Sequence, residues 1–221
     1  NNKKNYLMSI VIGFYWMSLK KKSLYTSLIF LFFLSGYFLI QRVVTSGDMS
    51  LLIEIDEAIP LMPEFVWIYH SLPLFVLLVM VVLIKRAPVF WRTFYSCLMA
   101  SVVMFLCFIA LPIEYPRPEV MASGISSALL VATQELDYAH NTCPSGHVAF
   151  AWLMFLAAVK TQWVRHEPWM GRVFLLWAIG IILSTLVLKQ HFIADVIAGV
   201  FLASFSFYMA KFVVKHQPAA S

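Results

Sequence analysis

The sequence predicts an all-α membrane protein, a bundle of six transmembrane helices that forms one domain over residues 1–221. Three observations predict this class. Of the residues, 62% are hydrophobic and 12% are charged, and a soluble domain could not hide so much apolar surface. The 19 Phe, 7 Trp and 9 Tyr suit a bilayer with aromatic interfaces. Six apolar stretches also approach or reach the roughly 17–25 residues that a membrane-spanning helix needs.

The six apolar stretches are separated by more polar connections and cover residues 24–40, 65–84, 89–111, 148–164, 173–188 and 192–214. The second stretch contains His70 and Pro73, and a proline inside a helix predicts a kink. Before the first stretch, an apolar segment within residues 1–22 has lysines on both sides. This segment predicts either an interfacial helix or a lead-in to the first membrane span.

Lysine and arginine fall mostly on one side of this six-helix arrangement. Of the 16 basic residues, all but Arg42, Arg117 and Lys189 lie on the side that holds both termini. Of the 11 acidic residues, only Glu167 lies on that side. Because an excess of Lys and Arg marks the cytoplasmic side, both termini are predicted to be cytoplasmic. The basic balance is therefore a topology signal, and we expect no nucleic-acid partner.

The cysteines do not predict a metal site. Cys97 and Cys107 fall inside one apolar stretch, and Cys143 lies outside it. No CxxC or mixed His/Cys ligand spacing is present, so we expect neither a metal centre nor a disulfide framework.

The sparsely charged side receives three polar segments that are far apart in the sequence. The first is "PSGH", residues 144–147. Ser145 suits a helix N-cap, and Gly146 lets a ligand approach the backbone closely. The N–H groups of a helix start favour an anion such as phosphate, and His147 can donate a proton to a leaving oxygen. A plain helix start with an interfacial histidine explains the segment equally well.

The second polar segment pairs a histidine with a carboxylate. His191 and Asp195 are four residues apart, so a helix puts them on one face. An aspartate that accepts from one ring nitrogen leaves the other lone pair free, which prepares a nucleophile or base. Ser184 faces the same site if the preceding helix continues. A pair that only caps a span is the alternative, but ionisable groups at membrane depth are costly and usually functional.

The third polar segment is "YPRP", residues 115–118. Its two prolines hold Arg117 in an extended segment, and a planar guanidinium suits phosphate oxygens. Taken alone, this arginine is better explained by a lipid headgroup or a glutamate partner. Lys189 is either a second phosphate ligand or a lysine that extends to the membrane interface.

Together the three segments resemble the membrane branch of the type 2 phosphatidic acid phosphatase superfamily. The family's pattern is Lys-x6-Arg-Pro, then Pro-Ser-Gly-His, then Ser-Arg-x5-His-x3-Asp. Arg117 and the following proline match the end of the first part, and residues 144–147 match the second part completely. Ser184, His191 and Asp195 match the third part at the same spacing.

The chain departs from this pattern at two cationic positions. The family lysine is replaced by Ala110 and the family's second arginine by Thr185. In this respect the chain is similar to the sub-branch that includes inositol phosphorylceramide synthase and sphingomyelin synthase. A phosphomonoester carries about two negative charges and a phosphodiester one, so fewer cations suit a less charged group. Arg117 and Lys189 are the two cations that can compensate.

The resemblance implies an enzyme of lipid metabolism that needs no metal or other cofactor. It implies that His191 attacks phosphorus to form a phosphohistidine, that Asp195 orients His191, and that His147 protonates the departing lipid oxygen. It also implies a set of groups that hold the phosphoryl oxygens: Arg117, Ser145, Gly146, Ser184 and Lys189. The expected site is extracytoplasmic and the expected location a bacterial inner membrane.

Several functions fit these residues. The first is hydrolysis of a lipid phosphate or polyprenyl diphosphate. The second is transfer of a phospholipid headgroup to an alcohol, which the two replaced cations favour. A proton-coupled transporter would also use membrane His and Asp residues, and an inactive lipid-binding relative is a fourth possibility. In the enzyme readings, the partners are a lipid phosphate or phospholipid substrate and the surrounding membrane lipids.

Overall fold

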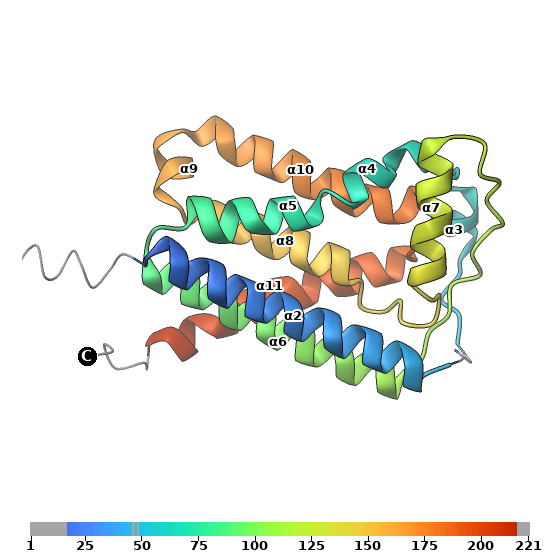
Figure 1. The fold of residues 1–221 in the computed structure, drawn as a ribbon, viewed down its shortest axis with the longest axis horizontal. Coiled ribbons are helices and arrows are strands. Elements are labelled where there is room, and N and C mark those ends of the chain that lie inside the picture. Colours follow the sequence, from blue (N-terminus) through green and yellow to red (C-terminus); the bar gives the residue numbers. More distant parts are fainter. Residues whose placement is uncertain (1–16, 46, 48, 216–221) are drawn as a thin grey trace, which may run out of the picture.

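The computed structural model describes residues 17–45, 47 and 49–215. These residues form helices and connections, with one isolated bridge between Met49 and Ile113 and no β-strand in the described part of the chain. The long helices run side by side along the long axis of the molecule (Figure 1). Most of the predicted lead-in helix within residues 1–22 lies outside the described residues.

Five helical segments of the described chain are long and apolar enough to cross a membrane. Together with the composition, they make the chain an integral membrane protein. The segments are α2 (Leu19–Val43), the broken segment Pro63–Leu83, α6 (Ala87–Ala110), α10 (Pro168–Val187) and α11 (Ile193–Lys215). They correspond to the first, second, third, fifth and sixth predicted stretches.

The fourth predicted stretch, residues 148–164, is shorter than expected. Its helix α8 covers Gly146–Ala158, and the separate helix α9 (Gln162–His166) begins where the Thr161 side chain accepts a hydrogen bond from the Val164 N–H. At 1.5 Å per residue α8 is about 20 Å long, less than the roughly 30 Å of a hydrocarbon core. The helix is also the most enclosed, since it contacts α5, α6, α10 and α11. The described chain therefore has five helices of spanning length where the sequence predicts six.

The second predicted stretch is interrupted near its proline. It consists of η1 (Pro63–Phe65), α4 (Val66–Tyr69), α5 (Leu72–Leu77) and the π-helical segment η2 (Leu78–Leu83). The break falls at His70 and Ser71. Pro73 follows two residues later, in the first turn of α5, and its ring and missing N–H disfavour a continuous helix. The Trp177 indole N–H donates to Ser71 Oγ (2.8 Å) and braces the break against α10.

Two short helices cover the end of the bundle where α8 begins, and the sequence did not predict them. They are α3 (Glu54–Ala58) and α7 (Ile125–Leu136), both at the right of Figure 1. Helix α7 packs against η1 and α4. It encloses polar residues of the neighbouring helices at this end.

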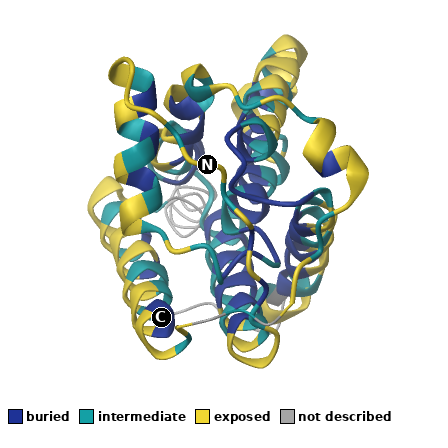
Figure 2. Ribbon diagram, turned by 90° about the vertical axis from the view of Figure 1, so that its right-hand side faces the viewer, coloured by how far each residue is buried: buried dark blue, intermediate teal, exposed yellow. Residues whose placement is uncertain are grey.

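Apolar side chains cover the outside of the bundle as well as its centre. Figure 2 looks onto the end that carries α7 and shows buried residues gathered inside and exposed residues on the outer helix faces. Leu39 and Phe201 are examples of large apolar residues on the outside, with exposures of 64% and 71%. Such outward apolar faces fit contact with lipid acyl chains.

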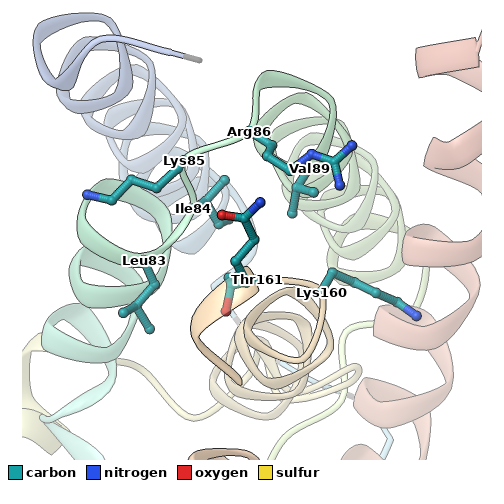
Figure 3. Close-up of a pocket in the computed structure, with 8 residues that line it drawn as sticks. Leu83, Ile84, Lys85, Arg86, Val89, Lys160 and Thr161 are labelled. Atoms are coloured by element: carbon teal, nitrogen blue, oxygen red, sulfur yellow. The ribbon is translucent and has the colours of Figure 1, made fainter. Parts of the chain in front are cut away.

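The opposite end of the bundle is basic. Figure 3 shows Lys85, Arg86 and Lys160 there, between the turn after η2 and the turn after α8. Arg165 and Lys211 lie nearby and line a cavity together with Arg86 and Lys160. Within the described residues, none of these five cations forms an ion pair with a carboxylate.

Candidate active site

The connection between α10 and α11 carries His191. Helix α10 ends at Val187, and the Thr185 carbonyl accepts hydrogen bonds from the Gln190 and His191 N–H groups (3.0 and 3.3 Å). Lys189 has a φ of 54° in this tight turn. We expected His191 to lie on the helix itself, but α11 begins two residues later.

His191 and Asp195 nevertheless meet. His191 Nδ1 lies 3.2 Å from Asp195 Oδ2, and this oxygen also accepts from the Phe192 N–H (3.0 Å). Asp195 is fully buried and His191 is 8% exposed. Because Asp195 is an acceptor, the contact assigns the ring proton to Nδ1 and leaves the Nε2 lone pair free.

Ser145 fixes the start of α8 against α11. Its hydroxyl accepts from the Val148 N–H (3.4 Å), which makes it the N-cap. Its backbone N–H donates to the Asp195 carbonyl (3.2 Å). Gly199 permits this contact, because a Cβ there would lie 2.9 Å from the Ser145 carbonyl oxygen. The close helix contact places the first turn of α8 beside the His–Asp pair.

His147 and His191 line the same cavity, which has a volume of about 330 Å³. The Tyr69 ring stacks on the His147 ring, with centroids 3.8 Å apart. The other walls come from α2, α4, α6, α7 and α8 and from the non-helical positions His70 and Asn141. Polar and small residues of these walls are Tyr37, Tyr69, His70, Thr133, Asp137, Asn141 and Gly146. The two histidines predicted to act together are thus brought together.

An apolar cavity adjoins this polar one. It has a volume of about 160 Å³ and shares Phe33, Leu34, His70 and His147 with the first cavity. Its remaining walls come from α2, α5, η2, α6 and α8, and Cys97 lies on its α6 wall. The arrangement offers an apolar recess among the membrane helices directly beside the histidines.

Arg117 reaches this region through Asp137. Its Nη1 donates to the Asp137 carbonyl, and its Nη2 lies 3.6 Å from Asp137 Oδ2. The Tyr37 hydroxyl donates to the other carboxylate oxygen of Asp137. Asp137 itself lines the cavity, whereas Arg117 does not. The arginine predicted to bind phosphate is instead paired with Asp137.

Ser184 and Lys189 are not brought to the cavity. The Ser184 hydroxyl is buried and donates to the Ile181 carbonyl (2.6 Å) of its own helix. Lys189 Nζ donates to the Asp56 and Glu57 carbonyls (2.5 and 3.4 Å) of α3. Helix-end carbonyls favour a cation, which accounts for the direction of Lys189. The geometry therefore gives no support for the expected phosphate contacts of these two residues.

The Asp195 carboxylate contributes to the raised pKa values of two nearby loop residues, Cys143 and Tyr115. Burial raises the pKa of the Cys143 thiol to about 12, and the neighbouring Asp195 carboxylate adds to the rise. Burial likewise raises the pKa of Tyr115 to about 12, with Asp56 and Asp195 as further causes. The anionic forms of Cys143 and Tyr115 are therefore disfavoured beside Asp195.

Sequence reasoning did not single out Tyr69 or Asn141, and it treated His70 only as a residue of the second apolar stretch. Tyr69 and His70 lie at the break in the second stretch, and Asn141 lies in the coil before the "PSGH" segment. Polar groups beside a proline break at membrane depth are a signal that could have pointed to Tyr69 and His70. No helix periodicity marks Asn141.

The comparison with family models identifies the family of the chain. The model of the PAP2 superfamily matches residues 91–218. The chain belongs to the PAP2 superfamily. The resemblance to type 2 phosphatidic acid phosphatases is thereby confirmed, and the match contains Arg117, residues 144–147, His191 and Asp195. Neither the curated proteins nor the solved structures give a match to the chain.

Members of the PAP2 superfamily are phosphoric-ester hydrolases or phosphotransferases that act on lipid phosphates in membranes. This PAP2 protein is therefore an integral-membrane enzyme of that class. Among the described residues, no group of three or more His, Cys, Asp or Glu side chains is arranged to hold a metal ion.

Proposed function

We propose that this PAP2 enzyme cleaves a lipid phosphate or polyprenyl diphosphate through a phosphohistidine on His191. One observation carries the proposal: His191 and His147 line one cavity, while Asp195 binds the far nitrogen of the His191 ring. This is the arrangement that a nucleophile, its orienting carboxylate and a proton donor require.

The first step transfers the phosphoryl group to the enzyme. His191 Nε2 attacks phosphorus, and the P–O bond to the lipid breaks with its electron pair on the lipid oxygen. Protonated His147 gives its proton to that oxygen, so the lipid leaves as an alcohol or, from a diphosphate, as a monophosphate. The Asp195 carboxylate stabilises the positive charge on the phosphorylated imidazole. The first N–H groups of α8, at Gly146 and its neighbours, face developing negative charge favourably.

The second step releases the phosphoryl group. Neutral His147 takes a proton from water, and the water oxygen forms a bond to phosphorus. The P–N bond then breaks, and its electron pair returns to His191 Nε2. Both histidines finish in the protonation states in which they began, as a catalytic cycle requires.

We further propose a topology of six spans in one domain of residues 1–221, with α8 as the enclosed, short crossing. Both termini are cytoplasmic, and the histidines are reached from the extracytoplasmic side. The unpaired cations at the opposite end (Figure 3) support this orientation, because basic residues collect on the cytoplasmic side. A bacterial inner membrane is the proposed location, and the apolar recess is suited to the lipid chain.

Headgroup transfer is the alternative function. No Lys or Arg is among the residues that line the histidine cavity, and the family's cationic positions hold Ala110 and Thr185. An alcohol then replaces water in the second step, and His147 takes the proton of the acceptor hydroxyl. The product is a new phosphodiester, with no free phosphate.

The test is a panel of lipid phosphates, polyprenyl diphosphates and phosphodiesters, each supplied with and without an added alcohol. Hydrolysis predicts free phosphate, and transfer predicts a new phosphodiester that needs the alcohol. His191→Ala should abolish either product, whereas Lys160→Ala at the opposite end serves as the matched control. Turnover that persists in His191→Ala would contradict the proposal.

A further inference from the structure

Two buried polar side chains of the histidine cavity have no hydrogen-bond partner. Asn141 is 4% exposed, and neither its Oδ1 nor its Nδ2 contacts a protein donor or acceptor. Tyr69 is 1% exposed, and its hydroxyl is equally unpaired. Both line the cavity that contains His147 and His191.

Burying a donor or acceptor without a partner is costly, and among the described residues with such atoms these are the two that line the histidine cavity. The orientation of the Asn141 amide does not affect the observation, since both of its polar atoms are unpaired and a flip would only exchange them. A ligand that offers acceptors to the Tyr69 hydroxyl and the Asn141 Nδ2, and a donor to Asn141 Oδ1, would satisfy all three atoms.

The charge of the cavity limits what this ligand can be. No lysine or arginine lines it. Arg117 is bound to Asp137, and Lys189 is bound to the backbone of α3. Asp137 contributes a carboxylate to the wall, but that carboxylate is paired with Arg117, so the cavity offers a ligand no positive charge beyond that of a protonated histidine. A singly charged phosphate is therefore accommodated better than a doubly charged one.

We propose that Asn141 and Tyr69 bind the phosphoryl group of a phosphodiester lipid whose headgroup carries a hydroxyl. The Asn141 Nδ2 and the Tyr69 hydroxyl donate to phosphoryl oxygens, and Asn141 Oδ1 accepts from the headgroup hydroxyl. The stacking of Tyr69 on His147 holds this donor beside the proton-transferring ring. This inference rests on the phosphohistidine chemistry of the proposed function and favours its headgroup-transfer alternative, because a phosphodiester lipid is the substrate of that reaction and neutral donors replace cations.

The test measures lipid binding by the full-length protein in detergent at pH 8, on a His191→Ala background that prevents turnover. The probes are phosphatidylglycerol, phosphatidylmethanol and phosphatidic acid, with identical acyl chains. Phosphatidylglycerol has one charge and hydroxyls, phosphatidylmethanol has one charge and no hydroxyl, and phosphatidic acid has about two charges. We expect affinity to fall in that order, by about tenfold between the first and the last.

Two variants remove the proposed contacts separately. Tyr69→Phe keeps the ring that stacks on His147 and removes only the hydroxyl. Asn141→Leu keeps a similar volume and removes the amide. Each should weaken phosphatidylglycerol binding about tenfold. Tyr208→Phe on the outer surface of α11, where Tyr208 is 54% exposed, is the matched control and should bind as the parent does.

Thermal unfolding separates a ligand contact from a structural role. Without ligand, Asn141→Leu should raise Tm by about 2–4 °C, because it removes an unpaired buried amide. A lower Tm with unchanged phosphatidylglycerol affinity would overturn the proposal, as would equal affinity for phosphatidic acid. If the wild type still forms a phosphohistidine at His191, only the ligand assignment has then failed. If that label is absent as well, the proposed function fails with it.

Discussion

Two cavities of similar volume lie at opposite ends of the bundle. Histidines line one of them, and lysines and arginines line the other. The cavity at the start of α8 measures about 330 Å³ and is lined by two catalytic-type histidines and by no Lys or Arg. The cavity at the other end measures about 300 Å³. Its walls contain five cations, which are Arg86, Arg92, Lys160, Arg165 and Lys211.

Positive charge therefore does not by itself mark the site proposed to handle phosphate in this membrane protein. Cations at one end of a helical bundle orient the chain in the bilayer. The groups proposed to react at the other end are held by contacts instead, such as Asp195 on His191 and Tyr69 on His147. Preorganised groups in a water-poor cavity act strongly without a high net charge.

The largest effect should come from deleting one imidazole in the first cavity. His191→Ala should lower phosphoryl transfer by at least about a thousandfold, because it removes the nucleophile. Lys160→Ala in the basic cavity should stay within about twofold of the wild type. Initial rates with the best substrate of the panel measure both. Equal losses of rate in the two variants would contradict the functional difference between the two cavities.

Cys143, in the loop before α8, offers a chemical probe of the surroundings of Asp195. With a pKa of about 12 in place of 9.0, Cys143 should alkylate roughly a thousandfold more slowly at pH 8 than an ordinary thiol, because the thiolate is the reactive form. Its rate should rise with pH. A variant that lacks Cys97 and Cys107 isolates the signal for mass spectrometry.

Removing the Asp195 charge tests whether this carboxylate helps to raise the pKa of Cys143. Since that carboxylate contributes to the raised pKa, Asp195→Asn should lower the pKa and accelerate alkylation. A rate that is unchanged would mean that Asp195 does not influence this thiol.

The same Asp195→Asn substitution should reduce turnover by about a hundredfold or more, since an amide no longer fixes the ring proton at His191 Nδ1. The fold should survive, because the residue retains an oxygen for the Phe192 N–H. Turnover and circular dichroism of the same preparation check both parts. Full activity would show that the His–Asp contact does not serve the reaction.

A smaller effect should follow from crowding the contact between α8 and α11. In Gly199→Ala the new Cβ would lie 2.9 Å from the Ser145 carbonyl oxygen, so the first turn of α8 must move. We expect a loss of stability of about 1–3 kcal/mol and roughly tenfold slower turnover through misplacement of His147.

Gly180→Ala on α10 is the matched control for this crowding. Its Cβ would meet only Ile68 Cγ2, at an ordinary 3.4 Å, so stability should hold or rise slightly. If Gly199→Ala behaves like Gly180→Ala in both stability and turnover, the close helix contact is not what positions the site.

The smallest effect belongs to the basic cavity. Arg165 is exposed and has no ion-pair partner in the described part of the chain. Arg165→Ala should therefore change the free energy of unfolding by less than about 0.5 kcal/mol. Denaturation in detergent measures this change. A large loss would show that the cations of this end stabilise the bundle.

The helical class and the His–Asp contact could be predicted because each depends on local patterns. Apolar stretches give the membrane helices, and a spacing of four residues brings His191 to Asp195. The early end of α8 was missed because apolar residues resume at Trp163 and Val164, after the short polar run 160–162 that contains the Thr161 cap. Length and hydropathy alone therefore overestimated this helix.

The residues proposed to bind phosphate were harder to predict, because their partners are distant in the sequence. Lys189 binds carbonyls of α3 that lie more than 130 residues away, so its position beside His191 in the sequence is misleading. Asn141 and Tyr69 become candidates only when their burial and their missing partners are seen in three dimensions. The periodicity of the sequence predicts neither the burial nor the missing partners.

The central claim is that His191 receives the phosphoryl group in the cavity it shares with His147. Its most direct test is to quench the enzyme with substrate under alkaline conditions, which preserve phosphohistidine, and to locate the modified residue by peptide mass spectrometry. The account predicts phosphate on His191 in the wild type and none in His191→Ala. Steady turnover with phosphate on a different residue, or with none on the protein, would contradict it.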